Sequence, residues 1–278
     1  MRFRRRRIGP RRIVRYVAIL PTLMTLGNAV CGLLALIYML KRPDPDFVTA
    51  AWLILAAMVF DGLDGYVARY THTTSGFGAQ LDSLCDAVTF GVVPAILALQ
   101  LVSTEVKGLT PFAHKSLAAC VIIYACCALI RLARFNVESS KDESHDHFAG
   151  LPSPGAGGLL AAATITWEAL QAETEFASLA RFLVTYGIPS IAFLSAILMV
   201  SRVRYPHMIN RVLRGFRPFT TLIEIVIVGL LIFVLHQTAI FVGFLVYVAS
   251  GPALSVKRLL FPRSKAQATP EPQDESVR

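Results

Sequence analysis

Long apolar runs constrain the fold of this chain more than any other feature of its sequence. A helix that crosses the hydrocarbon core of a bilayer needs about 20 mostly apolar residues, and the sequence contains about eight such runs. They cover residues 21–40, 47–68, 78–99, 116–132, 154–170, 183–200, 219–235 and 238–256. No segment alternates with period two over enough length for a transmembrane strand. The sequence therefore predicts an all-α fold, a polytopic membrane bundle of about eight transmembrane helices.

The composition agrees with this prediction and excludes a soluble globular domain. Hydrophobic residues occupy 55% of the 278 positions and charged residues only 16%, whereas about 25% of the residues in an ordinary soluble domain are charged. Mean hydropathy is +0.58. A chain with so few charges must leave apolar side chains on its surface, which indicates that lipid surrounds it.

Basic residues are unevenly distributed, and their distribution predicts the orientation. The first 15 residues hold eight of the 27 lysines and arginines and no acidic residue, so they supply most of the net charge of +9. If the amino terminus is cytoplasmic, the inside segments hold 22 basic residues and the outside loops hold five. Because cytoplasmic loops are enriched in Lys and Arg, we expect both termini in the cytoplasm and the chain in the cell inner (cytoplasmic) membrane.

These patterns divide the chain into three predicted segments. Residues 1–20 form a basic juxtamembrane segment, residues 21–260 form the transmembrane domain, and residues 261–278 form a disordered cytoplasmic tail without apolar periodicity. Arginines directly before an apolar run suit the anionic headgroups of membrane lipids better than nucleic acid. A topology signal alone explains these arginines equally well.

Four aspartates lie at the predicted cytoplasmic ends of the second and third spans: Asp61, Asp64, Asp82 and Asp86. A carboxylate costs free energy inside a membrane, about 2.5–3.5 kcal/mol at the centre of a helix. Helical periodicity places Asp61 and Asp64 on one face of their helix. Asp82 and Asp86 are one turn apart on the next helix. The two helices can therefore face each other with the four carboxylates between them.

This concentration of negative charge favours a bound cation. Arg69 alone cannot neutralise four carboxylates, whereas one or two divalent ions can, and carboxylate oxygens select Mg²⁺, Mn²⁺ or Ca²⁺. Small residues surround the aspartates; they are Gly62, Gly65, Ala68 and Gly78. Their small size suits the approach of a bulky ligand, and helix packing explains it equally well. From spacing alone, a cation pathway in a carrier and a set of neutralised structural carboxyls also remain open.

The same residues carry a family resemblance. The chain contains Asp61-Gly-Leu-Asp64-Gly65-Tyr-Val-Ala68-Arg69, then eight residues, then Gly78-Ala-Gln-Leu-Asp82-Ser-Leu-Cys-Asp86. All eight defining positions resemble the signature of the CDP-alcohol phosphatidyltransferases. Residues 20–28, 82–94, 131–136 and 148–154 further resemble the branch of this family whose acceptor alcohol is serine. The resemblance covers the first five predicted spans.

The resemblance implies transfer of the phosphatidyl group of CDP-diacylglycerol to L-serine, which gives phosphatidylserine and CMP. It implies that Asp61, Asp64 and Asp82 hold divalent cations, two Mg²⁺ or Mn²⁺ ions. Asp86 would be a further metal ligand and the catalytic base for the alcohol. The residues implied for the nucleotide and CDP-diacylglycerol are Asn28, Gly65, Ala68, Arg69 and Gly78. A homodimer is also expected from the resemblance.

Two arginines at the inner end of the fourth predicted span are candidates for serine binding. Arg131 and Arg134 are three residues apart, and a planar guanidinium can bind a carboxylate through two parallel hydrogen bonds. Arginines at cytoplasmic helix ends are also common as membrane anchors, so both roles remain open.

Two other functions compete with this prediction. The first is the same transfer to a different alcohol, such as glycerol 3-phosphate or inositol phosphate. The second is a cation-coupled membrane carrier that uses the aspartates for transport. The carrier fits less well because the carboxylates cluster at one membrane face, whereas the binding sites of carriers usually lie near the midplane.

Overall fold

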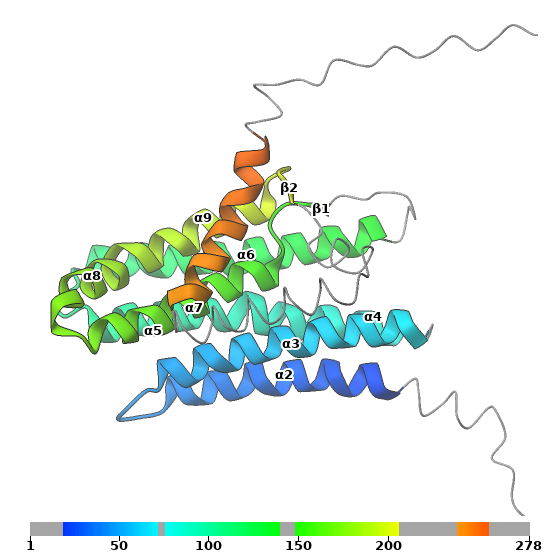
Figure 1. The fold of residues 1–278 in the computed structure, drawn as a ribbon, viewed down its shortest axis with the longest axis horizontal. Helices are drawn as coiled ribbons and strands as arrows, with labels where there is room; N and C mark the ends of the chain where they lie inside the picture. Colours follow the sequence, from blue (N-terminus) through cyan, green and yellow to red (C-terminus); the bar gives the residue numbers. More distant parts are fainter. Residues whose placement is uncertain (1–18, 72–75, 140–147, 206–237, 256–278) are drawn as a thin grey trace, which may run out of the picture.

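The computed structural model describes residues 19–71, 76–139, 148–205 and 238–255 of the chain (Figure 1). Three sequence-based predictions concern other residues. The predicted span at 219–235 and the predicted tail at 261–278 lie outside the described residues. So does the basic segment at 1–20, except for its last two positions.

The described chain is helical apart from one short strand pair. Its labelled helices are α2 (Ile19–Leu40), α3 (Phe47–Thr71), α4 (Gly76–Asp86), α5 (Val93–Glu105), α6 (Pro111–Ser139), α7 (Ser153–Gln171), α8 (Ala177–Phe182) and α9 (Ile188–Val200). Short turns of other helix types join some of them: the π-helices η1 (Ala87–Val92) and η3 (Leu183–Gly187), and the 3-10 helix η2 (Thr174–Phe176). A last helix covers Thr238–Ser255.

Within the described residues, six stretches are long and apolar enough to cross a membrane. They are Pro21–Leu40, Phe47–Val67, Gly76–Glu105, Pro111–Val137, Thr174–Val200 and Thr238–Ser255. Each overlaps a predicted span, and the all-α membrane bundle is confirmed. The span predicted at 154–170 does form a helix, α7, but α7 is not among the six stretches. The count of eight and the location of the termini therefore stay predictions.

The helices form a bundle with α7 at its centre. Helices α2 and α3 pack along each other on one side, α6 packs against α9 on another, and α7 contacts both α3 and α9 (Figure 1). The turns that join α2 to α3, α5 to α6 and α7 to α8 lie together at one end of the bundle. The start of α4 and the end of α6 lie at the opposite end.

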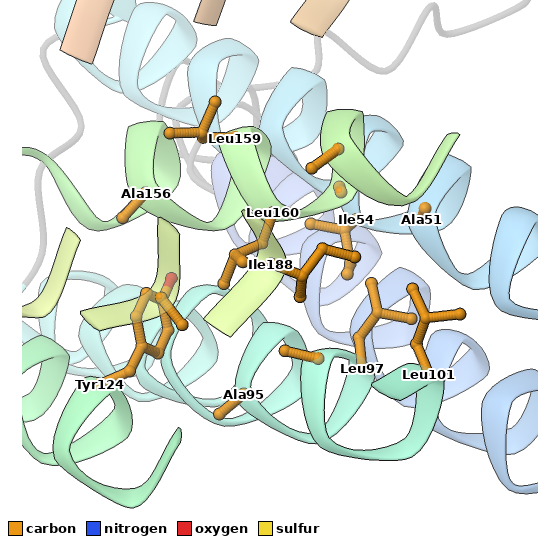
Figure 2. Packing of buried hydrophobic residues seen from close by; sticks show 14 of the residues in the cluster. Ala51, Ile54, Ala95, Leu97, Leu101, Tyr124, Ala156, Leu159, Leu160 and Ile188 are labelled. Atoms are coloured by element: carbon orange, nitrogen blue, oxygen red, sulfur yellow. The ribbon is translucent and has the colours of Figure 1, made fainter. Parts of the chain in front are cut away.

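Helix α7 differs from its neighbours because it is buried on all sides. Every residue from Gly155 to Trp167 is buried, and small residues in this stretch let neighbouring helices approach closely. Figure 2 shows Leu160 of α7 in the core beside Ile54 of α3 and Ile188 of α9. The outer helices instead expose apolar side chains such as Ile37 and Phe112, as expected for a surface that faces lipid.

A strand pair ties the start of α7 to the end of α9. Strand β1 (Phe148–Ala149) pairs antiparallel with β2 (Arg204–Tyr205). Gly150 follows β1 with a φ of 91°, a left-handed conformation that disfavours side chains, and its N–H donates to the carbonyl of Val203 at 2.8 Å. A Cβ at Gly150 would also collide with the carbonyl oxygen of Met199. Only glycine fits here, and this junction fixes where α7 begins.

Candidate active site

Three carboxylates from two helices converge at the bundle end where α4 begins. Asp61 and Asp64 come from α3 and Asp82 comes from α4, and one oxygen of each lies within 4.8 Å of the other two. Asp64 is buried, whereas Asp61 and Asp82 are half-buried. Three negative charges this close repel one another strongly unless a cation neutralises them. Helical spacing explains the convergence, since Asp61 and Asp64 share one face of α3.

These carboxylates fit a metal ion by the chemistry of their donors. All three offer hard oxygen ligands, which favour hard divalent cations. The Oδ1 atom of Asp82 is buried and has no hydrogen-bond partner among the described residues. A buried carboxylate oxygen normally has a partner. For Asp82 Oδ1 a metal ion would supply this partner. The cluster can therefore hold a metal ion.

Asp86 lies one turn beyond Asp82, in the same cavity but outside the three-carboxylate group. It is buried, and its Oδ1 accepts a hydrogen bond of 2.9 Å from the Nδ2 of Asn28 on α2. Asp86 is thus held by the neighbouring helix. Asn28 was predicted to contact the nucleotide; it is fully buried, and its described contact is with Asp86.

Helix α2 supports the acidic group at a second point. The Oγ1 of Thr25 donates to Asp64 Oδ2 at 2.8 Å, and Thr25 is one helical turn before Asn28. Thr25 has no role among the sequence-based predictions. The available signal was a pair of polar residues three positions apart in an otherwise apolar run, which places both on one face of a helix.

The aspartates form one wall of a cavity of about 350 Å³. Arg131, Leu132 and Phe135 of α6 also line the cavity, as do Pro152, which directly precedes α7, and Pro154 in the first turn of α7. The cavity thus combines anionic, cationic and apolar surfaces. Such a combination suits a ligand that carries charge at one end and hydrocarbon at the other.

Arg131 faces the acidic wall from α6, whereas Arg134 is not among the residues that line the cavity. The Nη1 of Arg131 donates to Ser153 Oγ at 2.9 Å, and its guanidinium carbon lies 5.8 Å from the centre of the Phe135 ring. These contacts fix the orientation of the guanidinium. Of the two candidate arginines, the geometry favours Arg131.

The small residues predicted to admit substrate have different environments. Gly62 and Gly65 line the cavity, and a Cβ at Gly62 would meet no atom within 4 Å, so packing does not explain Gly62. Gly78 is half-buried in α4 and is not among the lining residues. Ala68 and Arg69 belong to α3, but their side chains lie outside the described part of the structure.

Ser83 is a further lining residue that sequence reasoning missed. It lies between Asp82 and Asp86 on α4 and lines the cavity. Its Oγ accepts a hydrogen bond of 2.9 Å from the Nδ2 of Asn136 near the end of α6. The contact links the acidic helix α4 to the helix that carries Arg131. No spacing rule pairs these two positions, because 53 residues separate them along the chain.

Fold and site together define a membrane-embedded protein with an acidic, metal-competent cavity at one end of its helix bundle. Residues 18–200 match the sequence model of the CDP-alcohol phosphatidyltransferase family. The matched segment contains the three clustered aspartates, Asp86 and Arg131. The chain belongs to the CDP-alcohol phosphatidyltransferase family, and it is an enzyme of that class.

Several curated relatives are similar over about two thirds of the chain or more. A protein of Helicobacter pylori (strain ATCC 700392 / 26695) is 34% identical over 190 residues, which are 67% of this chain and 71% of the relative. One of Bacillus subtilis (strain 168) is 32% identical over 188 residues, 68% of this chain and 90% of the relative. One of Methanocaldococcus jannaschii is 32% identical over 200 residues, which are 72% of this chain and 79% of the relative. Each is named CDP-diacylglycerol–serine O-phosphatidyltransferase.

Proposed function

We propose that this protein is a phosphatidylserine synthase, which transfers the phosphatidyl group of CDP-diacylglycerol to L-serine and releases CMP. The observation that carries the proposal is that an oriented arginine, Arg131, lines the same cavity as a three-aspartate cluster. The names of the relatives support serine as the acceptor. The positive-inside distribution supports a reaction at the cytoplasmic face of the inner membrane.

Asp61, Asp64 and Asp82 are the proposed ligands of two Mg²⁺ or Mn²⁺ ions, with Asp86 as a further ligand. A bound divalent ion would neutralise charge on the pyrophosphate and stabilise the oxygens that gain charge in the transition state. The three carboxylates give this part of the site its negative charge. From α2, Thr25 supports Asp64 and Asn28 supports Asp86 by the hydrogen bonds described above.

The proposed acceptor site lies between Arg131 and Asp86. The guanidinium of Arg131 binds the carboxylate of serine, and this contact directs the serine hydroxyl toward Asp86. The hydroxyl oxygen then bonds to the phosphorus that carries diacylglycerol. The bond from that phosphorus to the bridging oxygen breaks, CMP leaves with that oxygen, and Asp86 accepts the hydroxyl proton. A carboxylate beside a metal, such as Asp86, is a weak base. It can still accept the proton because a bound cation would also make the nearby serine hydroxyl more acidic.

The donor is proposed to lie on the α3 and α4 side of the cavity. Gly62 and Gly65 leave room there for a nucleotide to approach the backbone, and Ala68, Arg69 and Gly78 are proposed to complete this region. The lipid chains of CDP-diacylglycerol would extend into the bilayer beside the bundle. A homodimer is proposed from the family resemblance alone, and cross-linking in native membranes would test it.

An acceptor panel tests the proposed function. Purified protein is incubated with CDP-diacylglycerol, Mn²⁺ or Mg²⁺, and one alcohol at a time: L-serine, glycerol 3-phosphate or inositol phosphate. We expect CMP release with L-serine, and phosphatidylserine as the lipid product. CMP release with only a phosphorylated alcohol would assign the enzyme to another branch of the family. Ion flux into liposomes without CMP release would instead indicate a carrier.

A further inference from the structure

The helix that carries Asp82 and Asp86 changes its geometry directly after Asp86. Helix α4 ends at Asp86, the π-helix η1 follows over Ala87–Val92, and α5 continues the same span from Val93. The N–H of Val93 bonds to the carbonyl of Val88, five residues earlier. Single π turns of this kind occur frequently at functional sites.

A proline removes the α-helical donor of one carbonyl in this turn. In an α-helix the carbonyl of Phe90 would accept a hydrogen bond from the N–H of residue 94. Residue 94 is Pro94, which has no N–H. Loss of a donor to a buried carbonyl is costly, so a donor from another part of the chain stabilises the turn.

Tyr124 of α6 supplies that donor. Its hydroxyl donates to the carbonyl of Phe90 at 3.1 Å, and its side chain is fully buried. Figure 2 shows Tyr124 in the core beneath α7. A hydroxyl is the only polar group of tyrosine, so this single contact accounts for the choice of Tyr over Phe at a fully buried position.

Other helices approach the same turn so closely that a methyl group added to the glycines beside it would press on their neighbours. A Cβ at Gly32 of α2 would lie 2.5 Å from Oγ1 of Thr89, and one at Gly157 of α7 would lie 3.1 Å from Cγ of Pro94. Gly91, within the turn, faces Ala128 of α6. The π turn is therefore enclosed by α2, α6 and α7, so a change in its position must displace these helices or be passed along the chain to Asp86.

We infer that Tyr124 is a positioning residue, which fixes the π turn through the carbonyl of Phe90 and thereby sets the place of Asp86 in the cavity. The inference rests on the role proposed above for Asp86. The turn begins at the residue after Asp86, so a shift in the turn moves the Asp86 backbone. Asn28 holds the side chain of Asp86 from α2, and Tyr124 holds the backbone beyond it from α6.

A second π turn separates the effect of proline from the effect on the site. The turn η3 covers Leu183–Gly187 and is also followed by a proline, Pro189. None of its residues lines the acidic cavity. A proline thus follows both π turns, and only η1 is adjacent to Asp86; the inferred link to catalysis rests on this position of η1.

The chain offers a matched control for Tyr124. The hydroxyl of Tyr205 donates to the carbonyl of Val248 at 3.0 Å, and Tyr205 is only 2% exposed. Four residues after Val248 lies Pro252, so this carbonyl lacks its helical donor for the same reason. Tyr205 is not a cavity residue. Tyr205→Phe and Tyr124→Phe therefore remove the same kind of hydrogen bond, and only in the second does the acceptor carbonyl belong to the turn that follows Asp86.

The test measures CMP release, melting temperature and the two substrate KM values for wild type, Tyr124→Phe and Tyr205→Phe. We expect Tyr124→Phe to lower kcat about tenfold or more, since displacements near 1 Å can cost on the order of a hundredfold, with each KM changed less than about threefold. Tyr205→Phe should lower the melting temperature to a similar extent with kcat within about twofold of wild type. Equal kcat losses in both variants, or a wild-type kcat in Tyr124→Phe, would overturn the inference.

A second variant keeps the inference testable if Tyr124→Phe does not accumulate. In Gly157→Ala the new methyl group presses on Pro94 and on the turn from α7, and kcat should again fall with little change in KM. An unchanged kcat in folded Gly157→Ala would contradict the inference. Wild-type protein that releases no CMP with serine would count against the proposed function instead, which distinguishes the two failures.

Discussion

The clustered aspartates are the residues at which a change of one functional group should have the largest effect. Asparagine preserves the shape of Asp61, Asp64 or Asp82 and removes one charge from the proposed metal ligands. Each Asp→Asn variant should therefore release CMP about a hundredfold more slowly or worse. Mutation of a residue that only hydrogen-bonds to a metal ligand already lowers metal affinity or activity 10- to 100-fold. Steady-state rates at saturating substrate provide the measurement.

Asp46 provides the control for these variants. Its Oδ1 accepts a hydrogen bond of 2.8 Å from the backbone N–H of Thr49 at the start of α3, and asparagine performs the same capping role. Asp46→Asn should retain wild-type turnover. If two of the three cluster variants also retained it, the metal assignment would be wrong.

Arg131 tests the choice of acceptor. Arg131→Lys keeps the positive charge and loses the planar two-pronged geometry. The serine KM should rise on the order of ten- to a hundredfold, which corresponds to a charge-assisted contact of about 1.5–3 kcal/mol. The KM for CDP-diacylglycerol should change little. Arg134→Lys serves as the comparison, because Arg134 does not line the cavity; an unchanged serine KM in Arg131→Lys would leave Arg131 as a membrane anchor.

At the scale of residues, the sequence predicted the group of aspartates but not the side chains that support them. The sequence placed four carboxylates between two facing helices, and the structure brings together Asp61, Asp64 and Asp82, with Asp86 outside this group. The contacts of Thr25 and Asn28 with the aspartates could not be predicted, because they depend on how α2 is rotated against its neighbours. The assigned roles of all these residues stay predictions.

At the scale of elements, the junction at Gly150 links the site to α9. Gly150→Ala forces a side chain into a left-handed conformation and against the carbonyl of Met199. We expect a loss of about 1–3 kcal/mol and a fall of at least about 3 °C in melting temperature in detergent. Gly108 also has positive φ, but a Cβ there would meet nothing within 4 Å. A Gly108→Ala variant that melts as low as Gly150→Ala would show that the collision contributes nothing.

Helix α7 and the π turns mark what element-level patterns can predict. The apolar run at 154–170 correctly predicted a helix, but hydropathy does not distinguish a helix that faces lipid from one buried among other helices. The small residues from Gly155 to Gly158 were the available signal for burial. The π turns escaped prediction because one extra residue in a turn hardly alters an apolar run; Pro94 and Pro189 within predicted spans were the signal.

For the molecule as a whole, the distribution of basic residues predicts that the acidic cavity opens to the cytoplasm. Lys107 is exposed in the turn between α5 and α6, and Arg202 is exposed after α9. In a cysteine-free background, Lys107→Cys should react with an impermeant thiol reagent from outside intact cells. Arg202→Cys should react only after the cells are opened. Labelling of both positions from the same side would invalidate the predicted orientation.

The class of fold was predictable at this scale because lipid imposes a simple rule on composition: each crossing needs a long apolar run. The arrangement of helices was not, since every apolar run looks alike and packing depends on contacts between distant residues. The acidic cavity unites α3, α4, α6 and the start of α7, and no sequence period relates these four segments.

Metal removal tests most directly the central claim that the three-aspartate cluster acts in phosphatidyl transfer through a bound divalent ion. Purified protein is treated with EDTA and freed of chelator, and CMP release from CDP-diacylglycerol and serine is followed while Mg²⁺ or Mn²⁺ is added back. We expect no release without metal and full recovery with at least one of the two ions. Undiminished release in the metal-free sample would contradict the account.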